Sequence, residues 1–320
     1  MILEKCRAII AFNYDGVMWV CVSAHSDIHL CLAMKKFYCI CKKLICVEAE
    51  SFPGDNADWQ IFEAEEGKAD ISIECKICKA FPEMQGESRG RSGDFEVSVS
   101  GETVYRAFPM ANSHGSLTRY LASDTSHSET FFTEKSFPIM ADSRYMWSSV
   151  SLAQLILAKN AFFLHSSFIS VGGKAILFSA ASGVGKSTQA ALWQKHRGAE
   201  IINGDKAGIL VEDGVYACGV PFCGTSGICQ NRVMPLGAIV LLSQSEANSV
   251  ERLKGVEALQ GVLRNVHLDL LAPDEQRMIF DLLINLLARV PVYSLKCTAS
   301  EEAVNALETA LCDGGVIDGT

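Results

Sequence analysis

The stretch Ala180-Ala181-Ser182-Gly183-Val184-Gly185-Lys186-Ser187-Thr188 decides the fold expected of this chain. An apolar run at residues 175–178 precedes it, and a helix-like run at 189–193 follows it. A strand, a glycine-rich loop and a helix in this order form a phosphate-binding loop, in which backbone N–H groups and the positive end of the helix face the phosphates. The sequence therefore predicts a nucleoside triphosphate site.

The polar residues of this loop have expected tasks. Lys186 is expected to reach the β- and γ-phosphates and to face solvent while no nucleotide is bound, and the Ser187 hydroxyl is expected to bind Mg²⁺. The first position of the pattern is usually glycine and is Ala180 here, which is acceptable if that residue needs no positive φ. The alternative interpretation is an ordinary glycine-rich turn with a surface lysine.

The bulk properties limit the class of protein. The chain has 320 residues, of which 49% are hydrophobic, so it can form one large domain and a smaller one. Its net charge of −9 argues against nucleic acid or an anionic membrane as the main partner. No uncharged apolar run is long enough to span a membrane, and no signal peptide is recognised. A soluble cytoplasmic protein is expected.

The cysteines indicate free thiols. There are 13, and an odd number excludes a fully paired disulfide framework within one chain. Cys75 and Cys78 together with Cys39 and Cys41 could form a four-thiolate zinc site. However, the first pair has one intervening residue, and residues 73–77 alternate like a strand, which sends neighbouring side chains to opposite faces. Buried thiols without a stoichiometric metal are therefore expected.

The chain is expected to divide near residue 140. Residues 1–140 are interpreted as a β-rich domain with a hairpin at Gly101-Glu102, a polar loop at 85–93 and a linker at 112–134. The elements expected in residues 141–320 are a helix at 145–159, strands at 162–171 and 174–178 joined by Gly172-Gly173, a helix from 187 capped by Gly198, strands at 201–202, 209–211, 215–217, 236–242 and 292–295, a helix after Pro273, and a last helix with a Thr298–Glu301 capping box.

Two residues outside the loop are candidates for chemistry. Asp205 follows a predicted strand, one short helix after Lys186, so it can lie beside the loop and hold Mg²⁺ directly or through water. The alternative is that Asn203-Gly204 is a hairpin turn and Asp205 its solvated flank. His165 lies in the strand that precedes the loop, where a lone histidine is more often a core residue than a catalyst.

These residues resemble the catalytic domain of HPr serine kinase/phosphorylase, and more closely the HPr-kinase-like proteins of bacterial peptide-modification clusters. The resemblance covers residues 145–312 and is carried by His165-Ser166-Ser167, residues 179–188 and Ile201-Ile202-Asn203-Gly204-Asp205. It implies an α/β fold, a phosphoenolpyruvate carboxykinase-like phosphate-loop domain, for residues 141–320. No specific resemblance is recognised over residues 1–140, and this smaller β-rich domain is expected to recognise the acceptor.

The resemblance also implies roles for residues. Residues 182–188 would bind ATP, Ser187 and Asp205 would bind Mg²⁺, and His165, Lys186 and Asp205 would form the catalytic set. Residues 219–227 resemble the segment that closes the site in these relatives. The family carries two adjacent aspartates, of which the first is the base. Gly204 stands at that position, which leaves Asp205, Glu212 or Asp213 as the candidate base.

The predicted function is ATP- and Mg²⁺-dependent transfer of the γ-phosphate to a hydroxyl, that of a serine in a protein or peptide. A homo-oligomer is compatible with the sequence. The motif of the reverse phosphorolysis is not recognised, so kinase activity alone is expected. A nucleotide-binding sensor or scaffold without catalysis is the alternative that Gly204 favours. A metabolic phosphoenolpyruvate carboxykinase is less favoured, because it needs more basic residues around a dicarboxylate and a second metal site.

Overall fold

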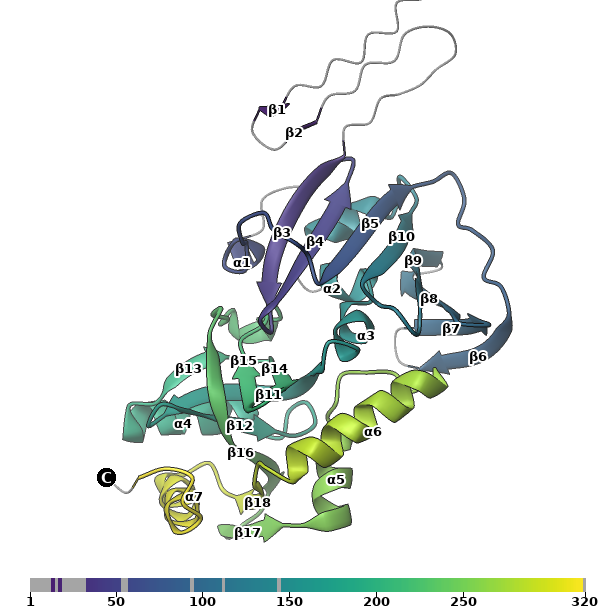
Figure 1. Ribbon diagram of the computed structural model, residues 1–320. Helices are drawn as coiled ribbons and strands as arrows, with labels where there is room; N and C mark the ends of the chain where they lie inside the picture. Colours follow the sequence, from purple (N-terminus) through teal and green to yellow (C-terminus); the bar gives the residue numbers. More distant parts are fainter. Residues whose placement is uncertain are drawn as a thin grey trace, which may run out of the picture.

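The computed structural model describes residues 13–14, 17–18, 33–52, 57–92, 95–110, 113–142 and 145–318. Two large mixed sheets of eight strands each give the chain a mixed α/β architecture (Figure 1). The short strands β1 (Asn13–Tyr14) and β2 (Val17–Met18) pair with each other. Within the described residues, no helix has both the length and the apolar character needed to cross a membrane.

The N-terminal sheet has the strand order β3-β4-β5-β10-β9-β8-β7-β6. Its neighbours pair antiparallel except at β5, which runs parallel to both β4 and β10. Its strands are β3 (Met34–Ile40), β4 (Lys43–Ala49), β5 (Ile71–Ile77), β6 (Glu87–Ser92), β7 (Phe95–Ser100), β8 (Thr103–Met110), β9 (Ser113–Leu121) and β10 (His127–Phe132). The accompanying helices are α1 (Ala57–Gln60), η1 (Phe137–Ala141), α2 (Met146–Ser149) and α3 (Leu152–Leu157).

The linker expected at 112–134 is wrong, because this segment contains β9 and β10. Its polar side chains have partners inside the fold: the Ser116 hydroxyl donates to the Ser149 carbonyl at 2.6 Å, and the hydroxyls of Thr118 and Thr130 lie 3.1 Å apart. A composition rich in serine and threonine therefore hides two strands. The polar loop expected at 85–93 is also largely a strand, β6, whereas the hairpin around Gly101 is confirmed.

The second sheet has the order β12-β11-β14-β15-β16-β18-β17, with β13 also on β11 and β16 also paired with β12. The strands from β12 to β16 therefore close into a ring. Its strands are β11 (Ala161–Val171), β12 (Lys174–Ser179), β13 (Glu200–Asn203), β14 (Lys206–Val211), β15 (Val215–Cys218), β16 (Val233–Gln244), β17 (Ser249–Leu253) and β18 (Val292–Cys297). Its helices are α4 (Lys186–Arg197), η2 (Gly224–Ser226), α5 (Gly255–Leu263), α6 (Pro273–Leu287) and α7 (Glu301–Asp313).

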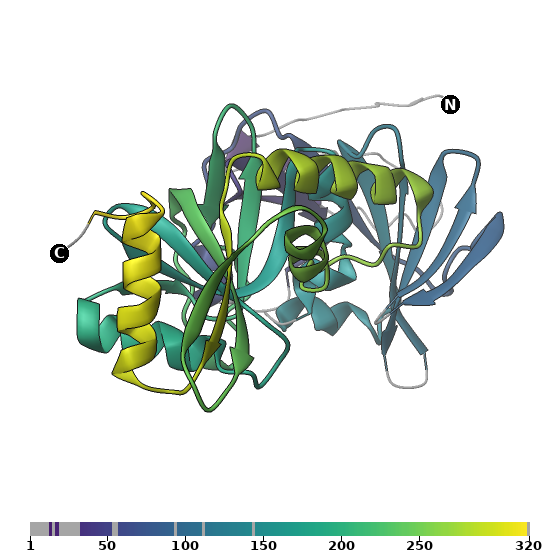
Figure 2. The ribbon, with the colours of Figure 1, turned by 90° about the horizontal axis from the view of Figure 1, so that it is seen from below.

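Strand β12 is buried on both faces. Ile176 and Phe178 pack with the helices α4 and α7, while Ala175 and Leu177 pack on the other side with α5 and α6. Figure 2 shows the two helix pairs on different sides of the sheet. Because alternate side chains meet an apolar layer on each side, the strand reads as the continuous apolar run that the sequence shows.

Two helix predictions need correction. The helix expected at 145–159 is divided into α2 and α3, because Ser151 takes a positive φ of 56° that a continuing helix does not allow. The Thr298–Glu301 capping box is wrong, since the Thr298 hydroxyl donates to Ser300 Oγ at 2.9 Å and Ser300 begins α7 without a side-chain cap.

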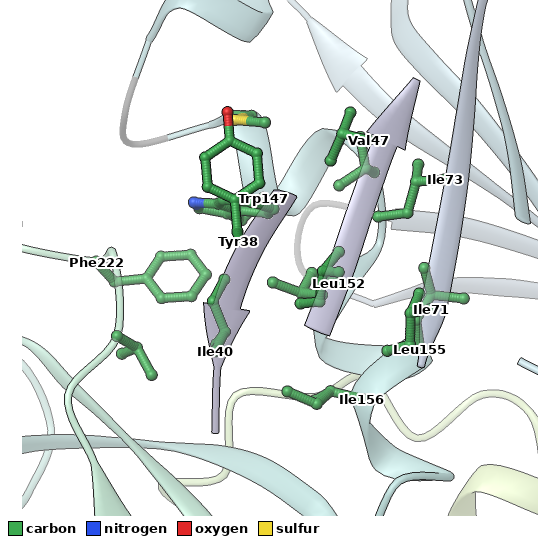
Figure 3. Close-up of a cluster of buried hydrophobic side chains, with 14 of the residues drawn as sticks. Tyr38, Ile40, Val47, Ile71, Ile73, Trp147, Leu152, Leu155, Ile156 and Phe222 are labelled. Carbon is green, nitrogen blue, oxygen red and sulfur yellow. The ribbon is translucent and has the colours of Figure 1, made fainter. Parts of the chain in front are cut away.

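One hydrophobic core joins the two sheets. Trp147, Leu152 and Leu155 of the connecting helices pack with Tyr38 of β3 and with Phe222 from the segment that follows β15 (Figure 3). The Tyr38 and Trp147 rings meet edge to face with their centroids 5.1 Å apart. The connecting helices therefore pack against both sheets, which also contact each other directly where Lys43 pairs with Glu212.

The cysteines do not all remain free. Cys223 and Cys229 form a disulfide with their Cα atoms 5.1 Å apart, which corrects the expectation of free thiols throughout. Cys75 is buried in β5, which raises the pKa of its thiol, and Cys41 hydrogen-bonds Cys218. Of the thirteen cysteines, Cys6, Cys21 and Cys31 lie outside the described residues.

Candidate active site

The predicted phosphate loop joins β12 to α4. Gly183 and Gly185 take positive φ values of 81° and 123°, a conformation that favours glycine, whereas Ala180 does not, so its methyl group is tolerated as expected. Gly185 precedes α4 without a side-chain cap, and the first turn of α4 contains no acidic residue. The N-terminal amides of this twelve-residue helix are therefore available to an anion.

Lys186 is buried, with 7% of its surface exposed, which contradicts the expected solvent-facing side chain. Its ammonium group donates to the carbonyls of Ala180 at 2.9 Å and Ala181 at 3.1 Å. Burial lowers the pKa of the Lys186 ammonium, and the Asp205 carboxylate opposes this change. The loop thus holds its own cation in place while no nucleotide is bound.

Asp205 lies at a kink where the chain passes from β13 to β14. Both strands pair with β11 rather than with each other, so the hairpin-turn alternative for Asn203-Gly204 is wrong. The kink is fixed by the Asn203 side chain, whose Oδ1 accepts the backbone N–H groups of Asp205 at 3.0 Å and Lys206 at 3.1 Å.

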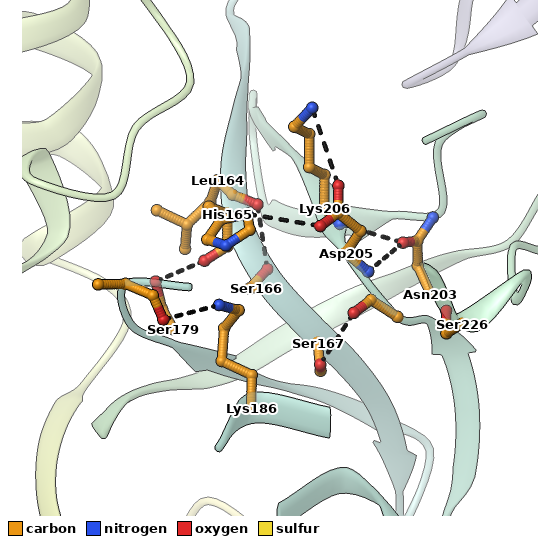
Figure 4. A network of polar contacts seen from close by, with 12 residues as sticks. Leu164, His165, Ser166, Ser167, Ser179, Lys186, Asn203, Asp205, Lys206 and Ser226 are labelled. Carbon is orange, nitrogen blue, oxygen red and sulfur yellow. Dashed lines mark hydrogen bonds and ion pairs between the residues drawn. The ribbon is translucent and has the colours of Figure 1, made fainter. Parts of the chain in front are cut away.

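His165, Lys186 and Asp205 come together around one space (Figure 4). His165 Nδ1 lies 3.7 Å from Asp205 Oδ1, and the strand carrying His165 is fixed by the Ser179 hydroxyl, which donates to the His165 carbonyl at 2.8 Å. Burial and the nearby Lys186 lower the pKa of His165, against the opposing effect of Asp205. The imidazole is therefore neutral near pH 7 and can accept a proton.

The remaining loop residues frame this space. Ser182, Gly183, Ser187 and Thr188 are exposed, and Val184 and Gly185 are half-buried. Ser187 lies in the first turn of α4 with its side chain open to solvent, and no contact joins it to Asp205 within the described residues. The structure thus brings together the three residues expected to be catalytic and places the second expected metal ligand on the neighbouring helix turn.

Two further groups lie at the site although no sequence pattern predicted them. Lys206 Nζ lies 3.8 Å from Asp205 Oδ2 and 4.3 Å from the centre of the Phe222 ring. Its position directly after Asp205 is a signal that could have identified it. His267 reaches the site because its backbone N–H donates to the Phe163 carbonyl at 2.8 Å, and burial lowers the pKa of its imidazole to about 3. Nothing in the local sequence around His267 indicates this placement.

Charge and space both suit a polyanion. Lys186 and Lys206 provide two cations around the single Asp205 carboxylate. A cavity of about 560 Å³ runs along the loop and is lined by His165, Ala181 and Val184, and another of about 320 Å³ lies across the loop next to Gly183 and Thr188. The loop therefore has open volume on both sides, large enough for parts of a nucleotide.

Gly204 has no room for a side chain. A Cβ atom there would lie 2.0 Å from Ser226 Oγ and 2.7 Å from Ser226 Cβ. Glu212 and Asp213 do not replace the missing carboxylate, because they lie at the far end of β14, where Glu212 pairs with Lys43 at 2.6 Å. Asp205 is therefore the carboxylate that faces Lys186 and His165.

We expect Gly204→Ala to lower the free energy of unfolding by about 1–3 kcal/mol, because the new methyl group collides with Ser226. Ser226→Gly removes both colliding atoms, so the double variant should be less destabilised than the sum of the two single variants. Urea unfolding of the four proteins measures this coupling. Additive effects within about 0.5 kcal/mol would contradict the close approach of these two residues.

Residues 219–232 cover the Asp205 side of the site. A Cβ atom at Gly224 would lie 2.6 Å from the Asp205 Cβ, so η2 packs directly on this residue. The Cys223–Cys229 disulfide closes this turn, and the Ser226 hydroxyl donates to the Cys223 carbonyl at 2.8 Å within it. The segment that was expected to close the site is therefore in contact with Asp205.

Comparisons with known proteins include a distant structural match. No family model matches the chain. No curated protein matches it either. Among solved structures, the Hpr(Ser) kinase/phosphatase from Coxiella burnetii aligns over 48% of this chain and 98% of its own, with 10% sequence identity and a TM-score of 0.29. The function proposed below therefore depends on the geometry of the site itself.

Proposed function

We propose that this protein is an ATP- and Mg²⁺-dependent kinase that transfers the γ-phosphate to a hydroxyl, that of a serine in a protein or peptide. The observation that supports this proposal is the convergence of Lys186, Asp205 and His165 beside a glycine loop that opens an uncapped helix. Phosphoryl transfer needs positioning and charge stabilisation more than bond-making by the protein, and these groups supply both.

The residues of the loop would hold the triphosphate. Backbone N–H groups of residues 182–188 would face its oxygens, and the Lys186 ammonium would exchange the carbonyls of Ala180 and Ala181 for the β- and γ-phosphates. Lys206, on the opposite side of Asp205, would add positive charge near the transferred group. We propose that residues 141–320 form this phosphoenolpyruvate carboxykinase-like catalytic unit.

Asp205 and Ser187 fit a magnesium site. Within the described residues no donor hydrogen-bonds the Asp205 carboxylate, from which His165 Nδ1 and Lys206 Nζ lie 3.7 and 3.8 Å away, so its oxygens are available to a hard cation. The exposed Ser187 hydroxyl on the first turn of α4 would provide a second oxygen. When bound, Mg²⁺ would supply charge that stabilises the phosphate oxygens in the transition state.

Two groups can take the proton of the acceptor hydroxyl. The neutral imidazole of His165 and the carboxylate of Asp205 face the same space, and each can accept a proton there. A strong base is not essential, because the transition state of phosphoryl transfer is loose. We propose that residues 1–140 recognise the acceptor and that the reverse phosphorolysis is absent.

A catalytically inactive nucleotide sensor is the second candidate. The observation that favours it is Gly204, whose side-chain space is filled by Ser226, so no carboxylate can stand next to Asp205. Both candidates predict nucleotide binding, and they differ in whether phosphate is transferred.

The test is to incubate the full chain with ATP, Mg²⁺ and a set of serine-containing peptides, and to follow the peptide mass. One added phosphate per peptide is expected, with loss of transfer after Mg²⁺ is chelated. His165→Ala should slow the step by about 10-fold or more, because it removes a proton acceptor. His196→Ala is the matched control, since His196 lies on α4 and faces Glu301 at 3.3 Å instead. Tight ATP binding without transfer to any peptide would favour the sensor.

A further inference from the structure

A second cavity adjoins the candidate active site. It measures about 240 Å³ and lies between the N-terminal sheet, the connecting helices and the segment before α6. Its walls include Phe95, Trp147, Gln154, Phe222, His267 and Asp269. We call it the acceptor cavity. Val266 and His267 also line the 560 Å³ cavity that contains His165, so about one side chain separates the two spaces.

Three residues that line the acceptor cavity each carry a buried polar atom without a hydrogen-bond partner among the described residues. Among the described residues nothing hydrogen-bonds Gln154 Oε1, Asp269 Oδ1 or Trp147 Nε1. The residues Gln154, Asp269 and Trp147 are 2%, 7% and 0% exposed, respectively, so bulk water does not compensate these atoms. Leaving such groups unpaired is costly, and native proteins rarely do so without a ligand or an ordered water. Two of the three atoms are acceptors, so the cavity favours a ligand that donates hydrogen bonds.

The charged residues beside the cavity indicate which kind of hydrogen-bond donor the ligand carries. Arg106 is fully buried and pairs with both Asp269 and Glu275. The other oxygen of Glu275 accepts the Tyr120 hydroxyl, and Gln154 Nε2 donates to Asp269 Oδ2 at 2.9 Å. One guanidinium therefore faces two carboxyl groups, and burial raises the pKa of Glu275 to about 7, so the cluster carries one net negative charge where Glu275 is ionised. A cation in the cavity would compensate that charge.

The apolar walls also suit a small cation. Trp147, Phe222 and Phe95 line the same cavity, and aromatic faces attract an ammonium group where water is excluded. One cation, Lys206 Nζ, already lies 4.3 Å from the centre of the Phe222 ring. His267, which is neutral because burial lowers the pKa of its imidazole to about 3, adds no competing positive charge. The volume of the cavity, its unpaired acceptor atoms and the carboxyl pair beside it thus all favour an ammonium group.

We propose that the acceptor cavity binds an alkylammonium group of the phosphate acceptor, placed a few bonds from the hydroxyl that receives the phosphate. This inference deepens the kinase proposal and rests on it for the role of the bound molecule. The ammonium donates to Asp269 Oδ1 and Gln154 Oε1, and the hydroxyl extends past His267 toward His165 and Lys186. The acceptor is then an amino alcohol or a peptide that begins with serine, and not an internal serine with acylated nitrogen.

The test uses two probes that differ only in this group, L-serinamide and N-acetyl-L-serinamide. Calorimetric titration of the full chain, with and without ATP, should give at least about 10-fold tighter binding of L-serinamide, a difference that one ionic hydrogen-bonded contact produces. Asp269→Asn should abolish this preference, whereas Asp281→Asn, an exposed position on α6, should retain it. The tripeptide amide Ser-Gly-Gly distinguishes a small amino alcohol from a peptide that begins with serine. If it binds as tightly as L-serinamide, the acceptor is a peptide terminus, and if it does not bind, the acceptor is a small amino alcohol.

A second variant guards against misfolding of Asp269→Asn, since Asp269 also pairs with Arg106. Ala153→Leu leaves the ionic cluster intact and fills the cavity from α3, so it should weaken L-serinamide binding by about 10-fold without changing ATP affinity. Equal affinity for the two probes, or no binding of either by a chain that binds ATP, would overturn the proposal and leave the kinase function standing. Loss of ATP binding with the serinamide preference intact would instead refute the kinase function alone.

Discussion

Lys186→Ala is expected to lower ATP affinity by about 100-fold or more, because it removes a buried charge from the point where the triphosphate would lie. The ammonium is already desolvated and held by two loop carbonyls, so its contact with phosphate gains from a low local dielectric. Calorimetric titration with ATP measures the loss.

The same structure shows why a fold check must accompany this variant. Removing Lys186 also leaves the carbonyls of Ala180 and Ala181 without their donor, which can loosen the loop. Lys186→Met keeps most of the buried volume and should lose affinity equally. Lys195→Ala, at an exposed position near the end of the same helix, is the matched control and should bind ATP normally. Unchanged ATP binding by a folded Lys186 variant would refute the phosphate-loop proposal.

Asp205→Asn is expected to reduce Mg²⁺-dependent turnover by about 100-fold or more while nucleotide binding without metal is kept or improved. The amide preserves the shape of the side chain but removes the negative charge that a hard cation needs. It also removes a negative charge that offsets Lys186 and Lys206, so metal-free binding of a polyanion should not weaken.

Asp213→Asn provides the comparison for this variant, because Asp213 follows the far end of β14. It should keep full turnover, since Asp213 lies outside the site. Turnover is measured over a range of Mg²⁺ concentrations for both proteins. Normal turnover of Asp205→Asn at low Mg²⁺ would show that Asp205 binds no metal. Loss of turnover in Asp213→Asn would instead support Asp213 as the base.

Local signals were sufficient for the core of the site. The glycines of the phosphate loop, the Gly172-Gly173 turn and the Gly198 cap each require a backbone conformation that few residues adopt, so the sequence indicates their positions directly. The strands β11 and β12, which flank the Gly172-Gly173 turn, consist mostly of buried residues, and their sequences are therefore rich in apolar residues. These elements were predicted within one or two residues.

Long-range pairing was not readable in the same way. His267 reaches the site through the bridge between Leu164 and Val266, which joins segments about a hundred positions apart. The buried state of Lys186 depends on loop carbonyls, and the strands β9 and β10 are stabilised by hydroxyl groups that pair only in the folded chain. In each case the deciding partner is distant in sequence or belongs to the backbone, so residue type alone carries no signal.

The double pairing of β12 affects how the site can move. Strand β12 is hydrogen-bonded to β11 along one edge and to β16 along the other, so the end that carries the phosphate loop cannot swing without breaking two ladders. Residues 219–232 are restrained in their turn by the Cys223–Cys229 disulfide. For the proposed kinase, adjustment during a reaction cycle is then left to side chains, above all to rotation of Lys186 away from its two carbonyls. Such rotations take nanoseconds or less in exposed groups and longer in buried ones, so they are fast compared with turnover. We therefore expect substrate entry or product release to limit the rate.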